Sequence, residues 1–273
     1  MLRRLIHDPR LSRWTPWFVP AVLVIIWQLA AHFGLLPVRI LPAPTSVIQS
    51  GVDLAKTGEL FEHLLISSRR AALGFLIGGS IGFTLGLLNG VFRTSELLFD
   101  GSLQMLRNLP LLALIPMVIA WFGIGEEAKV FIISLAVFFP IYLNTFYGIR
   151  SIDPDIIEMA RVYRLSTYEL FRDIILPGAL PTILLGVRYA LNFMWLTLIV
   201  AETISATSGI GYLAMNAREF MQTDVIVLTI LIYAVLGKLS DSLARLLESL
   251  LLPWHHSQQA AKKQQLLYGF SGS

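Results

Sequence analysis

The chain has 273 residues, of which 55% are hydrophobic and 14% are charged, with a formal net charge of +3 and no cysteine. Soluble domains carry about a quarter charged residues, so this composition is typical of a membrane protein. The lack of cysteine excludes disulfides, thiolate metal sites and cysteine nucleophiles. In a membrane protein a mildly basic balance mostly reflects orientation, and it need not indicate nucleic-acid binding.

Six mainly apolar runs have about the length that an α-helix needs to cross a bilayer. They are Trp17–Leu36, Ala71–Phe92, Leu109–Ile124, Ala128–Ile149, Pro181–Thr203 and Val225 to about Leu246. We therefore expect an all-α membrane protein with about six transmembrane helices. The third run is the shortest, and Pro116 and Pro140 are candidate bend positions inside the third and fourth runs.

Basic residues predict the orientation of these runs. They gather before the first run, between the fourth and fifth, and after the sixth, at Arg3, Arg4, Arg10, Arg13, Arg150, Arg161, Arg164, Arg172, Lys262 and Lys263. Because Lys and Arg are enriched in cytoplasmic loops, these segments and both termini are expected in the cytoplasm. The predicted organisation is a cytoplasmic tail over 1–16, a transmembrane domain over 17–252 and a cytoplasmic tail over 253–273.

Two features fit this orientation less simply. Arg69 and Arg70 fall at the outer end of the second run, where basic residues are not expected. An N-terminal signal peptide over residues 3–31 is disfavoured because no convincing small-residue cleavage site follows the apolar core.

Glycine recurs at every fourth residue of the second run. At 3.6 residues per turn these glycines form one stripe that lets a neighbouring backbone approach closely. The stripe comprises Gly74, Gly78, Gly82, Gly86 and Gly90. It predicts helix packing and says nothing about substrate.

The loop over 150–180 interrupts the apolar sequence with charged residues that still favour helix. Asp153-Pro154 is a strong helix start, and the first helix is expected to run to about Tyr163. Ser166 and Glu169 form a capping box that begins a second helix, which is expected to end before Pro177. The segment is therefore predicted to be a helix, a sharp turn and a helix at the cytoplasmic surface.

The residues alone leave two interpretations of this helix pair open. It is either an amphipathic pair in the lipid interface or a docking element for a cytoplasmic partner. A DNA-binding helix-turn-helix is rejected, because Glu169 and Asp173 balance Arg172 and membrane runs flank the pair.

A family motif decides between them. Glu158, Ala160, Ile174, Leu176 and Pro177 match, in the same spacing, the cytoplasmic motif of ATP-binding-cassette importer permeases, E-A-A, three residues, G, nine residues, I-x-L-P. The chain departs from the motif in having Met159 at the middle position and Arg164 at the glycine. A glycine there would suit a left-handed helix stop. We predict that the turn avoids a positive φ at Arg164.

The resemblance covers roughly residues 16–250. The strings "RILPAPTSVI", "QMLRNLPLLALIPMVIAWFGIG" and "RYALNFMWLTLIVAETISATSGIGYLAMNAREFMQTD" resemble the permease subunit of aliphatic sulfonate importers more than the branches for taurine, nitrate or pyrimidine precursors. The resemblance implies a type I ABC importer permease fold in the bacterial inner membrane. It assigns ATPase coupling to Glu158, Met159, Ala160, Tyr163, Arg164, Leu170, Phe171, Ile174, Leu176 and Pro177.

The implied partners are a second permease copy, two cytoplasmic ATPase subunits, an extracytoplasmic binding protein and the lipid bilayer, with no nucleic acid. The resemblance also implies that this chain binds no cofactor or metal, and that ATP with Mg²⁺ lies on the ATPase. Consistent with this, the sequence holds no G-x-x-x-x-G-K-[ST] loop. The stretches 37–68 and 204–224 are candidate docking surfaces for the binding protein.

Polar residues in the fifth run are candidates for the translocation pathway, because ionisable groups in a bilayer usually face a bundle interior or water. The candidates are Arg188, Asn192, Trp195 and Glu202. Snorkelling or pairing remains open for Arg188, capping or pairing for Glu202, and lipid-facing or bundle packing for Trp195. In the sixth run Lys238 and Asp241 are spaced to pair with each other.

Rival classes of function lack their signatures. A membrane-embedded enzyme needs catalytic groups within the spans, yet the five histidines fall near span ends or outside them, at His7, His32, His63, His255 and His256. An ion-coupled transporter or channel would favour acidic relays at mid-bilayer, and none is evident. The chain is therefore predicted to be a transport subunit and not an enzyme.

Overall fold

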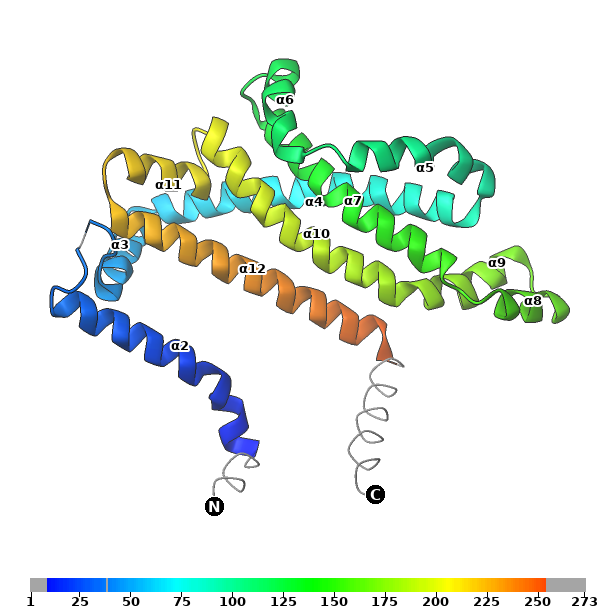
Figure 1. Ribbon diagram of the computed structural model, residues 1–273, viewed down its shortest axis with the longest axis horizontal. Helices are drawn as coiled ribbons and strands as arrows, with labels where there is room; N and C mark the ends of the chain where they lie inside the picture. The colour runs from blue at the N-terminus through cyan, green and yellow to red at the C-terminus, as the bar shows by residue number, and fades with distance from the viewer. Residues whose placement is uncertain (1–8, 38, 254–273) are drawn as a thin grey trace. The chain divides into compact units, whose positions relative to one another are not determined.

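The structure is a computed structural model that describes residues 9–37 and 39–253. Within these residues every regular element is a helix and no strand occurs, which confirms the all-α prediction (Figure 1). Most of the two predicted tails, with Arg3, Arg4, Lys262 and Lys263, lies outside the described residues.

The chain divides into two compact units. The first combines the residues up to Ile66 with Thr207–Tyr233, and the second combines Ser67–Ala206 with the residues from Ala234 onward. The first unit contains α2 (Pro9–His32), α3 (Pro44–Thr57) and α11 (Ile210–Glu219), with the first residues of α4 and α12.

Side-chain contacts hold the first unit together. Ser50 of α3 donates a hydrogen bond to Asp224, and Leu54 packs against an apolar cluster built on α11. The backbone N–H of Gly209 donates to Nδ1 of the buried His63 at 3.0 Å. These contacts join segments that lie far apart in the sequence.

The second unit is built on α4 (Glu59–Val91), α7 (Glu126–Arg150), α10 (Leu176–Ser205) and most of α12 (Thr223–Leu251). α10 lies along α7, and α4 lies along the same helix (Figure 1). The main core of this unit centres on Ile133 and Val137 of α7 and Leu198 of α10, which have no exposed side-chain surface.

The glycine stripe of α4 faces α7. A Cβ atom built at Gly78 would overlap the carbonyl oxygen of Ser134, and one at Gly82 would lie 2.6 Å from the carbonyl oxygen of Phe138. Real Cβ atoms do not approach backbone so closely, so the two helix backbones meet at a distance that only glycine permits. The same stripe continues at Gly86, which faces Tyr142 and Thr145.

The stretch predicted as the third span, Leu109–Ile124, contains a 3₁₀ turn and a short helix, and the helix that precedes it meets them at a sharp bend. The amphipathic helix α5 (Arg93–Arg107) comes first, and Pro110 separates it from a 3₁₀ turn, η1 (Leu111–Leu114), and the short helix α6 (Ile115–Phe122). The two helical parts meet at 88°. Pro110 and Pro116 lack backbone donors and favour helix starts, so they divide this segment.

Four helices of the described residues are long and apolar enough to cross a membrane, or five if the bent pair counts as one span. They are Glu59–Val91, Glu126–Arg150, Thr167–Ile204 and Thr223–Leu251. The apolar part of α2, Phe18–His32, has fewer than the 18 residues required of a candidate span. The second span was predicted to begin at Ala71, whereas α4 begins at Glu59. The helix includes polar residues before its apolar part, and hydropathy detects only the apolar part.

Candidate functional site

The predicted helix pair begins as the sequence indicates. α8 (Pro154–Val162) has Asp153 at its N-cap, and the Asp153 side chain accepts a hydrogen bond of 2.9 Å from the backbone N–H of Asp155. Pro154 occupies the first helical turn, where its missing N–H costs nothing. The predicted helix start is therefore confirmed.

The prediction for Arg164 was wrong, because its φ is +57°. The backbone N–H of Arg164 donates to the carbonyl of Arg161, and that of Leu165 donates to the carbonyl of Ala160. This pair of bonds is the Schellman motif, which needs a left-handed residue after the C-cap. The two bonds satisfy carbonyls at the end of α8, so they offset the strain that a side chain incurs at positive φ.

The second helix begins with the predicted capping box. The backbone N–H of Ser166 donates to Glu169 at 2.8 Å, and the backbone N–H of Glu169 donates to Oγ of Ser166 at 3.3 Å. The short helix α9 (Thr167–Glu169) follows and passes directly into a π-helical segment, η2 (Leu170–Ile175). The capping box is confirmed.

The predicted end before Pro177 was wrong, because η2 continues into α10 and the helix runs from Thr167 to Ile204. At the junction the backbone N–H of Leu176 donates to Phe171, five residues back. Proline in a regular helix clashes with the carbonyl four residues earlier. The wider π turn accommodates Pro177 without ending the helix.

The turn region exposes large apolar side chains, which we call the α8–α9 surface. Val162, Tyr163 and Tyr168 are 76%, 75% and 68% exposed, and Met159 and Ile156 belong to the same surface. Glu158 and Arg164 are also exposed, whereas Ala160 is buried. The remaining predicted coupling residues are half-buried, at Leu170, Phe171, Ile174, Leu176 and Pro177. The structure thus divides the predicted coupling residues into an exposed group and a group that packs on the chain itself.

The four pathway candidates do not share one site. Arg188 forms an ion pair with Asp241 of α12 at 2.7 Å, and the indole Nε1–H of Trp195 donates to Ser240 at 2.7 Å. Both side chains therefore contact α12. Asn192 is exposed. Asp241 also pairs with Lys238 at 4.0 Å, as the spacing predicted, and with Arg245.

Glu202 belongs to a buried ionic cluster. Its carboxylate accepts from Arg70 Nη1 at 2.8 Å and from Ser67 Oγ at 2.7 Å. Arg70 also pairs with Glu126 at 2.6 Å, and Glu126 accepts from the buried Lys129. The cluster joins α4, α7 and α10, and it explains why Arg70 is tolerated at a position where the topology rule does not expect a cation.

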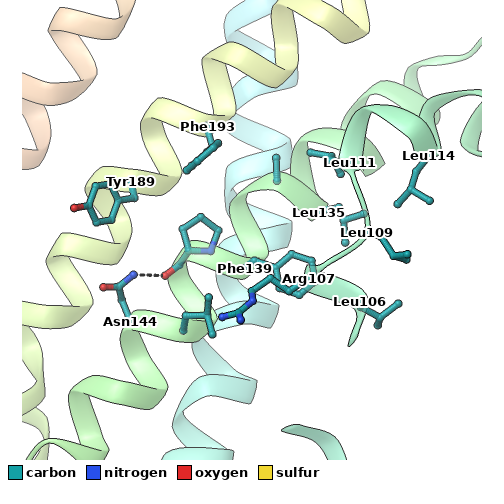
Figure 2. A pocket seen from close by; sticks show the side chains of 13 residues that line it. Leu106, Arg107, Leu109, Leu111, Leu114, Leu135, Phe139, Asn144, Tyr189 and Phe193 are labelled. Atoms are coloured by element: carbon teal, nitrogen blue, oxygen red, sulfur yellow. Dashed lines mark hydrogen bonds between the residues drawn. The ribbon is translucent and has the colours of Figure 1, made fainter. Parts of the chain in front are cut away.

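A pocket lies between the α5–η1 turn, α7 and α10 (Figure 2). Its volume is about 370 Å³. Figure 2 shows Tyr189 and Phe193 of α10 on one side and leucines of the turn on the other, at Leu106, Leu109, Leu111 and Leu114. Arg107 and Asn144 supply polar groups, and the amide of Asn144 donates to the carbonyl of Pro140 at 2.8 Å. The sequence does not indicate this pocket, because its walls meet only through the 88° bend.

The described residues include no group of three or more His, Asp or Glu side chains placed to hold a metal ion. The charged side chains of Arg70, Glu202 and Arg188 form ion pairs between helices.

Comparisons with known proteins agree on one family. The model of the binding-protein-dependent transport system inner membrane component matches residues 78–252. The putative aliphatic sulfonates transport permease protein SsuC of Escherichia coli (strain K12) is 60% identical over 90% of this chain and 93% of the relative. The protein of the same name from Bacillus subtilis (strain 168) is 46% identical over 88% of this chain and 87% of the relative.

A further relative and a solved structure are more distant. The taurine transport system permease protein TauC of Escherichia coli (strain K12) is 34% identical over 88% of this chain and 89% of the relative. The crystal structure of an amino acid ABC transporter with histidines matches with a TM-score of 0.55 at 19% identity, over 72% of this chain and 96% of that chain, which shows a shared fold. The chain therefore belongs to the family of binding-protein-dependent transport system inner membrane components.

Proposed function

We propose that the chain is the permease subunit of an ATP-driven importer for aliphatic sulfonates in the bacterial inner membrane. The substrate class is supported by the difference in sequence identity. The chain is 60% and 46% identical to two aliphatic sulfonate permeases, and 34% identical to a taurine permease. The chain is a transport subunit and not an enzyme, since its relatives are permeases.

The α8–α9 surface supports a cytoplasmic ATPase as the partner. Val162, Tyr163 and Tyr168 expose more than two thirds of their surface beside the charged Glu158 and Arg161. Large exposed apolar patches with a polar rim mark interaction sites. In the proposed assembly two permease copies, with both termini in the cytoplasm, contact two ATPase subunits through this surface and receive substrate from an extracytoplasmic binding protein. ATP and Mg²⁺ then lie on the ATPase.

The partner is tested by co-purification in detergent. Val162→Asp places a charge on the proposed interface and is expected to release the ATPase, because a buried unpaired charge opposes association. Ile40→Asp changes a side chain of similar exposure in the other unit and is expected to retain it. Equal ATPase retention by the two variants would count against coupling through the α8–α9 surface.

The substrate is tested by uptake into proteoliposomes that contain the permease, its ATPase and its binding protein. ATP-dependent uptake of labelled alkanesulfonates, exceeding that of taurine and nitrate, is expected. Uptake of taurine or nitrate alone would assign the importer to that substrate instead.

A further inference from the structure

The pocket between the α5–η1 turn, α7 and α10 has the size and lining of a ligand site (Figure 2). Small-molecule sites occupy about 300–1,000 Å³, are mainly apolar and hold a few polar groups that orient the ligand. This pocket has a volume of about 370 Å³, and ten of its thirteen lining residues are Leu, Phe, Ala or Pro. The other three are Arg107, Asn144 and Tyr189.

Arg107 gives the pocket its electrostatic character. Figure 2 shows its side chain extending from the α5–η1 side of the pocket toward the side where Asn144 lies. Among residues 9–37 and 39–253, no ion pair or side-chain hydrogen bond involves Arg107, whereas Arg70, Lys129 and Arg188 all pair with carboxylates. Arg107 is exposed on this chain, so its guanidinium is open to an anion that enters the pocket.

The position of the pocket along the membrane-spanning helices suits a transported ligand. Asn144 lies six residues before Arg150, the last residue of α7, so it sits about 9 Å along the helix from that end. The pocket is therefore placed within the length of the spans and not at their ends. Pro140, which interrupts the backbone bonding of α7, lines the same cavity.

Two chemical requirements follow for the occupant. Arg107 requires an anionic group, and the walls formed by Leu111, Leu135, Phe139 and Phe193 require an apolar tail. Nitrate has no tail to bury. Taurine carries an ammonium group, and no acidic residue is found among the described residues that line the pocket.

We propose that this pocket is a substrate subsite within the permease, which takes an alkanesulfonate with its sulfonate against Arg107 and its alkyl chain against the apolar walls. The inference rests on the proposed function and extends it, because it gives the permease its own selectivity for chain length. An anionic lipid shares the chemistry of head group and tail, so the test separates the two sources.

The experiment measures uptake by the complete importer in proteoliposomes, with the binding protein saturated by methanesulfonate or hexanesulfonate. Arg107→Gln is expected to lower uptake of both substrates about tenfold, and Arg107→Lys to retain most of it. Leu111→Trp fills the apolar end and is expected to lower the ratio of hexanesulfonate to methanesulfonate uptake about tenfold. This ratio does not respond to a general loss of folded protein.

Two matched controls lie outside the pocket. Arg93→Gln removes an exposed cation from the same helix as Arg107, and Leu112→Trp enlarges the exposed neighbour of Leu111. Both are expected to leave the two uptake rates and their ratio unchanged. The whole series is repeated in liposomes with and without anionic lipid.

Three results would overturn the inference. Wild-type uptake of alkanesulfonates with an unchanged ratio in Leu111→Trp would remove the subsite and leave the proposed function intact. An effect of Arg107→Gln confined to liposomes with anionic lipid would identify a lipid as the occupant. No alkanesulfonate uptake by the wild-type importer would remove the proposed function and the subsite together.

Discussion

α7 and α12 are equally apolar and yet very differently buried. The most apolar 18-residue windows of both helices have a mean hydropathy of 1.8, but 56% of the α7 window is buried inside the chain against 17% of the α12 window. Hydropathy therefore indicates that both segments suit a bilayer, and it does not indicate which one lies at the centre of the bundle.

The difference lies in the neighbouring helices. The glycines of α4 let its backbone meet α7, and Gly186 of α10 brings that helix against Pro140 and Asn144. α12 keeps a row of large apolar side chains exposed, at Ile230, Val235, Leu239 and Leu243. Small residues on a partner decide close packing in membranes, because lipid tails are as apolar as leucine.

The largest expected effect comes from adding a single methyl group at the α4–α7 contact, compared with adding one on α12. Gly78→Ala puts a Cβ into the backbone of α7 at Ser134, and we expect a loss of several kcal/mol and little folded protein. Gly237→Ala on α12 meets no atom within 4 Å and is expected to leave stability unchanged or slightly raised.

Thermal unfolding in detergent, with the folded fraction from size-exclusion chromatography, measures both variants. Similar melting temperatures for the two would contradict the assignment of α7 as the tightly packed helix.

A smaller effect is expected from the buried ionic cluster. Arg70→Met removes the guanidinium that pairs with the buried carboxylate of Glu202, and breaking a buried pair costs about 3–5 kcal/mol. Lys238→Ala on α12 breaks a pair whose lysine is 65% exposed, and such pairs contribute about 0–1 kcal/mol. Chemical unfolding of the two variants compares these losses, and a larger loss for Lys238→Ala would reverse the comparison.

Chemical labelling compares the exposure of the two helices directly. The chain has no cysteine, so Leu243→Cys on α12 and Ile133→Cys on α7 each provide one thiol. Leu243 is 51% exposed and Ile133 is fully buried, so a membrane-permeant maleimide is expected to react about tenfold faster or more with the α12 thiol. The rates are measured in detergent, and equal labelling of the two thiols would contradict the difference in burial.

The smallest expected effect lies in the turn that follows α8. Arg164 has a φ of +57°, and a left-handed conformation costs a residue with a side chain about 1 kcal/mol relative to glycine. Arg164→Gly is therefore expected to raise the free energy of unfolding by about 1 kcal/mol, or less because glycine also gains freedom in the unfolded chain. A clear loss of stability would show that the arginine side chain itself holds the turn.

Features encoded by neighbouring residues were predictable from the sequence. The cap at Asp153, the capping box of Ser166 and Glu169, and the course of α7 depend on residues within one or two turns of each other. The family motif and the longer strings then identified the family, because they preserve spacing as well as composition.

Features that depend on distant partners were not predictable. Arg70 finds Glu126 and Glu202, which lie 56 and 132 residues further along the chain. The pocket forms only because the chain bends by 88° between α5 and η1, which places residues from both sides of the bend against α7. The prediction for the turn at Arg164 was wrong because residue preference does not include the two Schellman bonds that compensate the strain.

The uninterrupted helix Thr167–Ile204 has a mechanical consequence. Its 38 residues extend about 57 Å, with the capping box at one end and the Glu202 carboxylate close to the other. The helix is continuous and its ladder lacks only the backbone donors of Pro177 and Pro181, so an axial displacement imposed at Ser166 is transmitted to the opposite end. A push of one turn, about 5.4 Å, would carry Glu202 beyond reach of Arg70.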